Sequence, residues 1–272
     1  MAADYPVPPG AVMRQRKAAE ARGRAFAGVW VRMTEIEALA EFPPCPHCAK
    51  PPALCVCEAV SPVENRVAAL ILQHPQEQDR LLGTARLAAQ QLSNATFKIG
   101  LSWPSLAKAL GRDADPSQWA VLHLGSAKPS DLPPGREVAV LDKKGVALPD
   151  QDSALKGIRG IVVFDGTWAQ AKTLWWRNAW VLKAKRIALA PKRRSLYGEL
   201  RREPRRESLS TIEAIGLALS AIEGKPEIDA GLREGFSTML AKYRAAVEAG
   251  EVSPQAPKAG GDRRRKWRGK KG

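Results

Sequence analysis

The sequence predicts an α/β fold in which helices cover both faces of a parallel β-sheet. Two short, mainly apolar runs, Val67–Gln73 and Gly160–Phe164, have the length of buried strands. Each precedes a segment of helical character, Thr84–Leu92 and Thr167–Asn178 respectively. Strands that are apolar throughout are typical of sheets buried on both faces, and alternation with helices is typical of parallel sheets.

The remaining elements of this sheet follow in order along the chain. Trp119–Leu124 and Glu137–Leu141 are strand-like runs, separated by a loop over 125–135 that contains three prolines. Arg186–Ala190 is a further candidate strand, and Leu209–Ile222 has a helical apolar pattern. The length of 272 residues, with 44% hydrophobic content, is sufficient for such a domain and one small module.

Composition divides the chain into four parts. Residues 1–41 are rich in Ala, Arg and Glu and predict a helical extension. Residues 42–60 form a Pro-rich and Cys-rich module, 61–250 form the α/β domain, and 251–272 form a basic tail that we expect to be disordered.

The formal net charge is +15 and the sequence pI is about 10.0, which indicates a polyanionic partner, with nucleic acid as the leading candidate. The alternative is a basic protein with a merely solvated surface. No apolar run approaches the roughly 18 residues of a membrane span, and the N-terminus lacks the pattern of a secretory signal. A cytoplasmic location, without membrane association or an obligate protein partner, is therefore expected.

All four cysteines of the chain lie in the pattern Cys45-x2-Cys48-x6-Cys55-x-Cys57. Four thiolates this close in sequence can converge tetrahedrally on one Zn²⁺, which would then be structural because no coordination position stays open for water. Two disulfides are one alternative, but disulfides are uncommon in a reducing compartment. An iron–sulfur cluster is the other, but this cysteine spacing does not match such clusters well.

Polar residues at strand ends are the candidates for chemistry, because ligands of α/β sheets bind beyond the carboxyl ends of the strands. Asp165 directly follows the apolar run Gly160–Phe164, and Thr167 and Trp168 come next. Asp165 or Thr167 has an alternative role as the N-cap of the following helix. Four tryptophans between Trp168 and Trp180 are dense for this chain, and packing explains at least two, while one is available to stack on a base.

Two further polar clusters flank expected helices. The first begins at Gln73-His74-Pro75 at the end of a strand and includes Glu77, Arg80 and Arg86, which suits binding of an anion or a ribose, although a simple turn is an equal alternative. The second is Ser210-Thr211-x-Glu213, which also has the pattern of a helix cap, with Ser210 as N-cap and Glu213 as its partner.

Four motifs, taken in their order and spacing, resemble the DTW-domain family. They are the cysteine cluster, His74-Pro75-x-Glu77, Asp165-x-Thr167-Trp168 and Ser210-Thr211-x-Glu213-Ala214. The resemblance covers about Cys45 to Glu223. It implies a fold related to the SPOUT class with a knotted S-adenosylmethionine site. It also implies transfer of the donor's 3-amino-3-carboxypropyl group to N3 of a tRNA uridine, in the variable loop in bacterial relatives, with methylthioadenosine as the leaving group.

The resemblance also implies roles for individual residues. Asp165 is the candidate general base that removes the N3 proton of uridine. The donor would be bound by Leu124, Gly125, Thr167, Trp168, Ser210, Thr211 and Glu213, and the RNA by His74, Glu77, Arg80 and Arg86. Leu122-His123-Leu124-Gly125 and Gly83 depart from the family pattern, which would have Tyr-Pro in the first loop and Asn in the second.

Two other classes of protein account for parts of the same sequence. An S-adenosylmethionine-dependent RNA methyltransferase of similar fold would share donor and substrate but would transfer the methyl group. A zinc-containing RNA-binding protein without enzymatic activity would explain the charge and the cysteines, but it gives Asp165 no role other than that of a helix cap.

Overall fold

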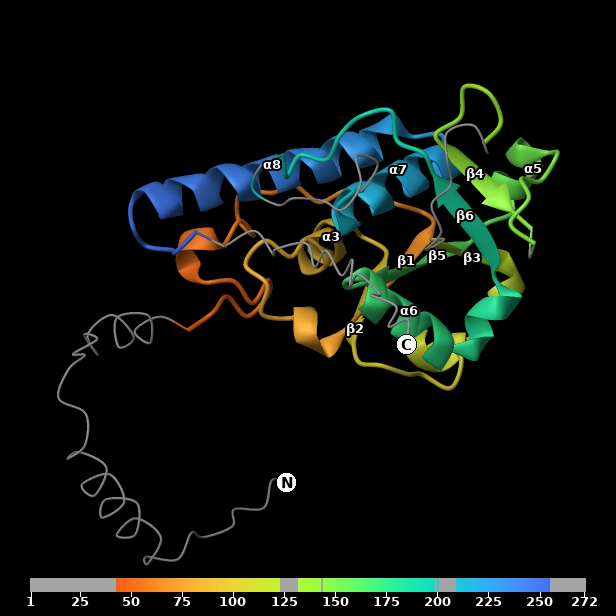
Figure 1. The fold of residues 1–272 in the computed structure, drawn as a ribbon, viewed down its shortest axis with the longest axis horizontal. Helices are drawn as coiled ribbons and strands as arrows, with labels where there is room; N and C mark the ends of the chain where they lie inside the picture. Colours follow the sequence, from red (N-terminus) through yellow and green to blue (C-terminus); the bar gives the residue numbers. More distant parts are fainter. Residues whose placement is uncertain (1–42, 123–131, 143, 199, 201–208, 255–272) are drawn as a thin grey trace, which may run out of the picture. The chain divides into compact units, whose positions relative to one another are not determined.

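The computed structural model describes residues 43–122, 132–142, 144–198, 200 and 209–254, and those from Pro44 onward belong to one unit of the chain (Figure 1). The expectations for residues 1–41, for Leu124 and Gly125, and for the end of the basic tail lie outside these ranges. None of the described helices combines the length and the apolar character needed to cross a membrane.

The described strands form a six-stranded sheet in the order β2-β1-β5-β3-β6-β4. All neighbours are parallel except β4, which runs antiparallel to β6 at one edge. The prediction of a wholly parallel sheet is therefore wrong for this strand. Because β4 is buried along its whole length, its apolar pattern carries no information about direction. The strand bounds are β1 Ala68–Gln73, β2 Ala95–Ile99, β3 Trp119–Leu122, β4 Val138–Leu141, β5 Gly160–Asp165 and β6 Lys185–Leu189.

Helices lie on both faces of the sheet, as predicted. Alternate side chains of β1 enter two separate cores: Ala69 and Ile71 join the larger core with α3, α7 and α8, whereas Leu70 and Leu72 join a second core with α4 and α6. The helix bounds are α3 Ala85–Gln91, α4 Leu106–Leu110, α5 Gln151–Lys156, α6 Trp168–Arg177, α7 Thr211–Glu223 and α8 Pro226–Glu248. Short 3₁₀ helices are η1 Pro52–Leu54, η2 Pro75–Glu77, η3 Pro116–Gln118 and η5 Ala179–Lys183.

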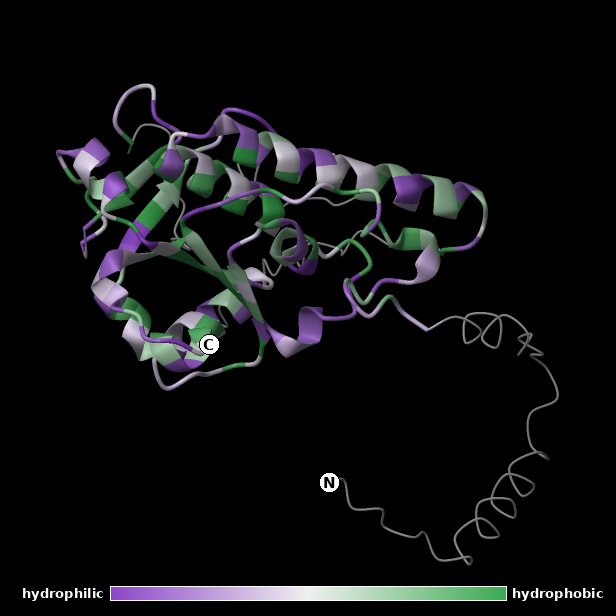
Figure 2. Ribbon diagram, turned by 180° about the vertical axis from the view of Figure 1, so that it is seen from behind, coloured by the Kyte–Doolittle hydropathy of each residue, from purple (hydrophilic) through white to green (hydrophobic). Residues whose placement is uncertain are grey.

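The long helix α8 was not expected from the sequence pattern. Gly224, in a left-handed conformation, ends α7, and Pro226 occupies the first turn of α8, so the segment between them has the composition of a loop. A Cβ at Gly235 would lie 2.3 Å from Oε1 of Gln91, so this glycine allows α8 to approach α3 closely. Hydrophilic and hydrophobic residues alternate along α8, which buries one stripe against the core (Figure 2). Strand β2 and helices α4 and α5 were also not expected.

Candidate functional site

Asp165 ends β5 in the middle of the sheet, where Gln73 ends the neighbouring strand β1 in register with it. The Gln73 side chain donates from Nε2 to Oδ2 of Asp165 at 2.8 Å. The hydroxyl of Thr211, the first residue of α7, donates to Oδ1 of the same carboxylate. Asp165 is thus held from two sides at the carboxyl edge of the sheet.

The N-cap of α6 is Thr167, which rules out the alternative that Asp165 is this cap. The Thr167 hydroxyl accepts from the backbone N–H of Gln170, and the Gln170 side chain accepts from the backbone N–H of Thr167 at 2.6 Å. This capping box satisfies the helix terminus without the Asp165 carboxylate. Asp165 is therefore not the cap of α6, and its carboxylate accepts hydrogen bonds from Gln73 and Thr211.

The turn that begins at His74 lies beside the start of α6. The backbone N–H of His74 donates to the carbonyl of Asp165 at 3.0 Å, and the Gln170 side chain donates to Oε1 of Gln76 at 3.1 Å. A Cβ at Gly166 would lie 2.9 Å from Cβ of Gln170 and 3.5 Å from Cβ of His74, so only glycine permits this approach. The His74 and Asp165 motifs, 91 residues apart in sequence, are therefore in contact.

The other residues predicted to bind RNA have partners within the protein. Glu77 is buried and forms a 3.3 Å ion pair with Arg80, and the guanidinium of Arg86 lies 5.1 Å from the ring centroid of Phe97. Nδ1 of His74 accepts from the backbone N–H of Gln76, so the imidazole also caps η2. The turn interpretation of this cluster is confirmed, and the partly exposed cations remain able to contact a phosphate.

Ser210 and Glu213 form the expected capping box of α7. Glu213 is only 1% exposed, and its two carboxylate oxygens accept five hydrogen bonds. Two come from the backbone N–H and hydroxyl of Ser210, and three come from Ser195, the backbone N–H of Leu196, and Arg233 at 2.8 Å. Because these protein donors occupy the carboxylate, Glu213 fixes the start of α7 and with it the position of Thr211.

Gln73 begins the polar cluster predicted at the end of this strand, but the sequence pattern gave it no individual role in the site. It is 4% exposed, and its Oε1 atom is buried with no hydrogen-bond partner among the described residues. A buried polar atom without a partner is costly, and such atoms concentrate at functional sites. The signal was available in the sequence, because Gln73 ends the apolar run Ala68–Leu72 as Asp165 ends the apolar part of β5.

The four tryptophans near α6 have two different environments. Trp175 packs edge to face on Phe164, and Trp180 is buried and donates from Nε1 to the carbonyl of Trp103, so the expectation that at least two serve packing is confirmed. Trp168 and Trp176 instead face solvent, with 43% and 76% of their surfaces exposed.

The four cysteines form a cluster that could hold a metal ion. All four Sγ atoms lie within 4.8 Å of one another, and two pairs, Cys45–Cys57 and Cys48–Cys55, are 3.8 Å apart. Zn–S bonds of about 2.3 Å in a tetrahedron require sulfur atoms roughly 3.8 Å apart, whereas a disulfide needs about 2.05 Å. The geometry therefore fits a tetrahedral four-thiolate site and not two disulfides.

The cysteine cluster is joined to the rest of the fold by buried contacts. Leu54 and Val56 belong to the larger core, and the Lys50 ammonium donates to the carbonyls of Leu81 and Gly83 in the loop before α3. Burial lowers the pKa of Lys50 to about 8. A hydrogen bond from the backbone N–H of Cys48 lowers the pKa of the Cys45 thiol to about 6.

Fold and site together define an α/β protein with a fixed carboxylate at the carboxyl edge of its sheet and a closed four-cysteine cluster. The DTW domain matches residues 42–244, well over half of the sequence. The chain therefore belongs to the DTW-domain family.

Three relatives bear the name tRNA-uridine aminocarboxypropyltransferase 2. The Macaca fascicularis relative is 28% identical over 69% of this chain, and the match spans 59% of the relative's length. The Mus musculus relative is 30% identical over 66% of this chain, and the match spans 57% of the relative's length. The Drosophila melanogaster relative is 28% identical over 78% of both chains. No solved structure matches the chain.

Proposed function

We propose that the protein transfers the 3-amino-3-carboxypropyl group of S-adenosylmethionine to N3 of a tRNA uridine. The observation that carries this proposal is that the other two strand-end motifs meet at Asp165. Gln73 and the Thr211 hydroxyl donate to its carboxylate, and the backbone N–H of His74 donates to its main-chain carbonyl. The names of the relatives support the same reaction. The target in the variable loop and a knotted, SPOUT-like cofactor site belong to this proposal.

The reaction needs a base and an aligned donor. N3 of uridine attacks the γ-carbon of the donor's methionine part while the bond from that carbon to sulfur breaks. The bonding electrons neutralise the sulfonium and methylthioadenosine leaves. The N3 proton must be removed, and Asp165 is the carboxylate held at the strand ends to accept it. Because the methyl group and the γ-carbon are both electrophilic, positioning selects between them.

Two helix N-termini contribute to binding of the donor in this proposal. Helix α6 begins at Trp168 and α7 at Thr211, and each follows or contacts Asp165. The positive ends of helix dipoles suit the α-carboxylate of the donor, which Thr167, Ser210 and Thr211 would orient. Trp168 would wall the pocket, Leu124 and Gly125 would lie near the donor, and Glu213 would position α7.

The remaining parts of the proposal concern tRNA and zinc. Arg80, Arg86 and His74, with Glu77 holding Arg80, would contact the RNA backbone beside the reaction site. Cys45, Cys48, Cys55 and Cys57 would hold one structural Zn²⁺, which stabilises the loop before α3 through Lys50.

The test uses purified protein, tRNA and two preparations of S-adenosylmethionine, one labelled in the methyl group and one in the methionine carboxyl group. Label from the carboxyl preparation, and none from the methyl preparation, should appear in tRNA and in the modified uridine. Methyl label in tRNA would instead identify a methyltransferase. If neither label is transferred and calorimetry detects no donor binding, the protein is an RNA-binding protein without this activity.

A further inference from the structure

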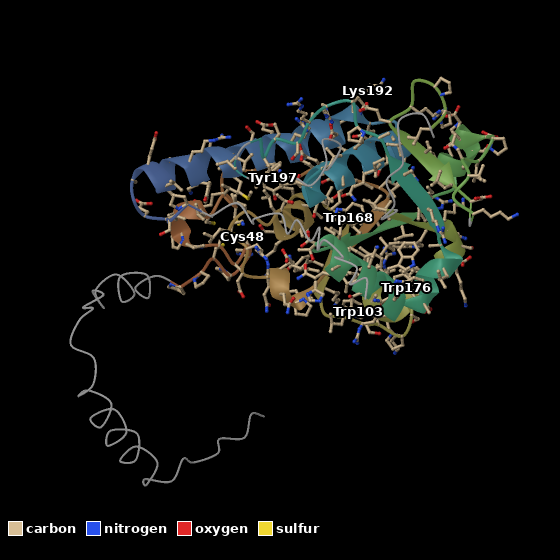
Figure 3. All side chains as sticks on the ribbon, in the orientation of Figure 1. Cys48, Trp103, Trp168, Trp176, Lys192 and Tyr197 are labelled. Atoms are coloured by element: carbon tan, nitrogen blue, oxygen red, sulfur yellow. The ribbon has the colours of Figure 1, made fainter. Side chains whose placement is uncertain are left out.

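The solvent-facing side of α6 carries two tryptophans separated by a lysine. Trp168, Lys172 and Trp176 are spaced four residues apart, so they lie on one face of the helix at intervals of about 6 Å. All three are exposed, and Trp176 has 76% of its surface in solvent. Figure 3 labels both tryptophans. We call these three residues the α6 stripe.

Packing of the core does not account for the stripe. The opposite side of α6 buries Ala171 and Leu174 against the sheet, and Trp175 contacts the Phe164 ring and the guanidinium of Arg186. Trp176 therefore adds apolar surface where a polar residue would serve the helix equally well. Isolated exposed apolar residues are ordinary, but two tryptophans aligned on one helix indicate a binding surface.

The charge around the stripe specifies the kind of partner. From Gly166 to Gly198 the sequence contains eight lysines and arginines and no acidic residue. Of these cations, Lys172, Arg177 and Lys183 are exposed in α6 and η5. Aromatic side chains interspersed with cations are the arrangement that binds single-stranded nucleic acid, because the rings stack on unpaired bases and the cations contact phosphates.

The stripe also starts at the reaction site. Trp168 is three residues after Asp165, and Trp176 is about 12 Å further along the helix axis. We propose that Trp176 stacks on an unpaired base of the RNA substrate close to the target uridine, while Lys172 contacts the intervening phosphate. This proposal rests on the proposed function in taking Asp165 as the place where the uridine reacts.

The test measures binding of a ten-nucleotide oligouridylate and of a duplex RNA of equal length, both without donor. Trp176→Ala should weaken binding of the oligouridylate roughly 5-fold to 150-fold and leave duplex binding unchanged, because duplex bases are already stacked. Trp176→Phe should keep most of the affinity. Lys172→Ala should reduce the slope of log affinity against log salt by about one.

Val146→Ala is the matched control, because Val146 is an exposed apolar residue, 62% exposed, outside the stripe. Equal oligouridylate affinity of Trp176→Ala and wild type would overturn the proposal. Equal losses of affinity for the oligouridylate and for the duplex in Trp176→Ala would also overturn it. So would an altered sedimentation coefficient of Trp176→Ala with unchanged RNA affinity, because that result would assign Trp176 to self-association. Absence of label transfer with normal RNA binding would contradict the proposed function alone.

Discussion

Replacement of Asp165 by asparagine removes one negative charge from the site and changes little else. The carboxylate oxygens accept from Gln73 Nε2 and from the Thr211 hydroxyl. Asparagine has nearly the same size and can accept from Gln73 while its amide donates to the Thr211 oxygen. It cannot accept a proton as a base. The substitution therefore separates the chemical role of Asp165 from its role in packing.

The structure sets different magnitudes for stability and for transfer. Exchanging charge-assisted hydrogen bonds for neutral ones costs about 1 kcal/mol, which lowers Tm by roughly 2–4 °C in a domain of this size. Loss of a general base lowers the rate by about 10²-fold to 10⁴-fold, equivalent to roughly 3–5 kcal/mol of transition-state stabilisation. Transfer should therefore fall far more than stability does.

The assay compares single-turnover transfer of carboxyl-labelled donor, donor affinity by calorimetry, and Tm. Asp150→Asn is the matched control, because Asp150 caps α5 by accepting from the Ser153 backbone at 3.0 Å and asparagine caps equally well. Normal transfer by Asp165→Asn would refute the base role. A tenfold or greater loss of donor affinity, with the rate of bound donor unchanged, would assign Asp165 to orientation of the donor instead.

Three further outcomes are expected. Metal analysis of protein purified without chelator should find one zinc per chain. Cys48→Ser should lower both the zinc content and the solubility of the protein. Four freely reactive thiols and no zinc in the wild-type protein would contradict the zinc site. Glu213→Gln should destabilise the fold by about 3 kcal/mol, because it leaves Arg233 with a neutral partner in a buried network. An unchanged melting curve would show that Glu213 does not position the start of α7. Truncation after Glu251 removes a tail with eight basic residues and one acidic residue. It should weaken tRNA binding and flatten the salt dependence of that binding without altering donor binding. Unchanged tRNA affinity at low salt would show that the tail is dispensable for tRNA binding.

The sequence by itself predicted those features that depend on local order along the chain. The central strands β1 and β5, the helices after them, and the capping box of Ser210 and Glu213 follow from apolar periodicity and from residue types at fixed spacing. The convergence of four cysteines within thirteen residues was predicted in the same way, because the connecting loop is too short to separate them.

Only the tertiary structure decided the features that depend on contacts between distant segments. It paired Gln73 with Asp165 and placed Thr211 on the same carboxylate. It also turned β4 antiparallel and placed Trp176 in solvent. In each case the local pattern allows more than one arrangement, and the choice is made by which distant strand end or helix face lies opposite.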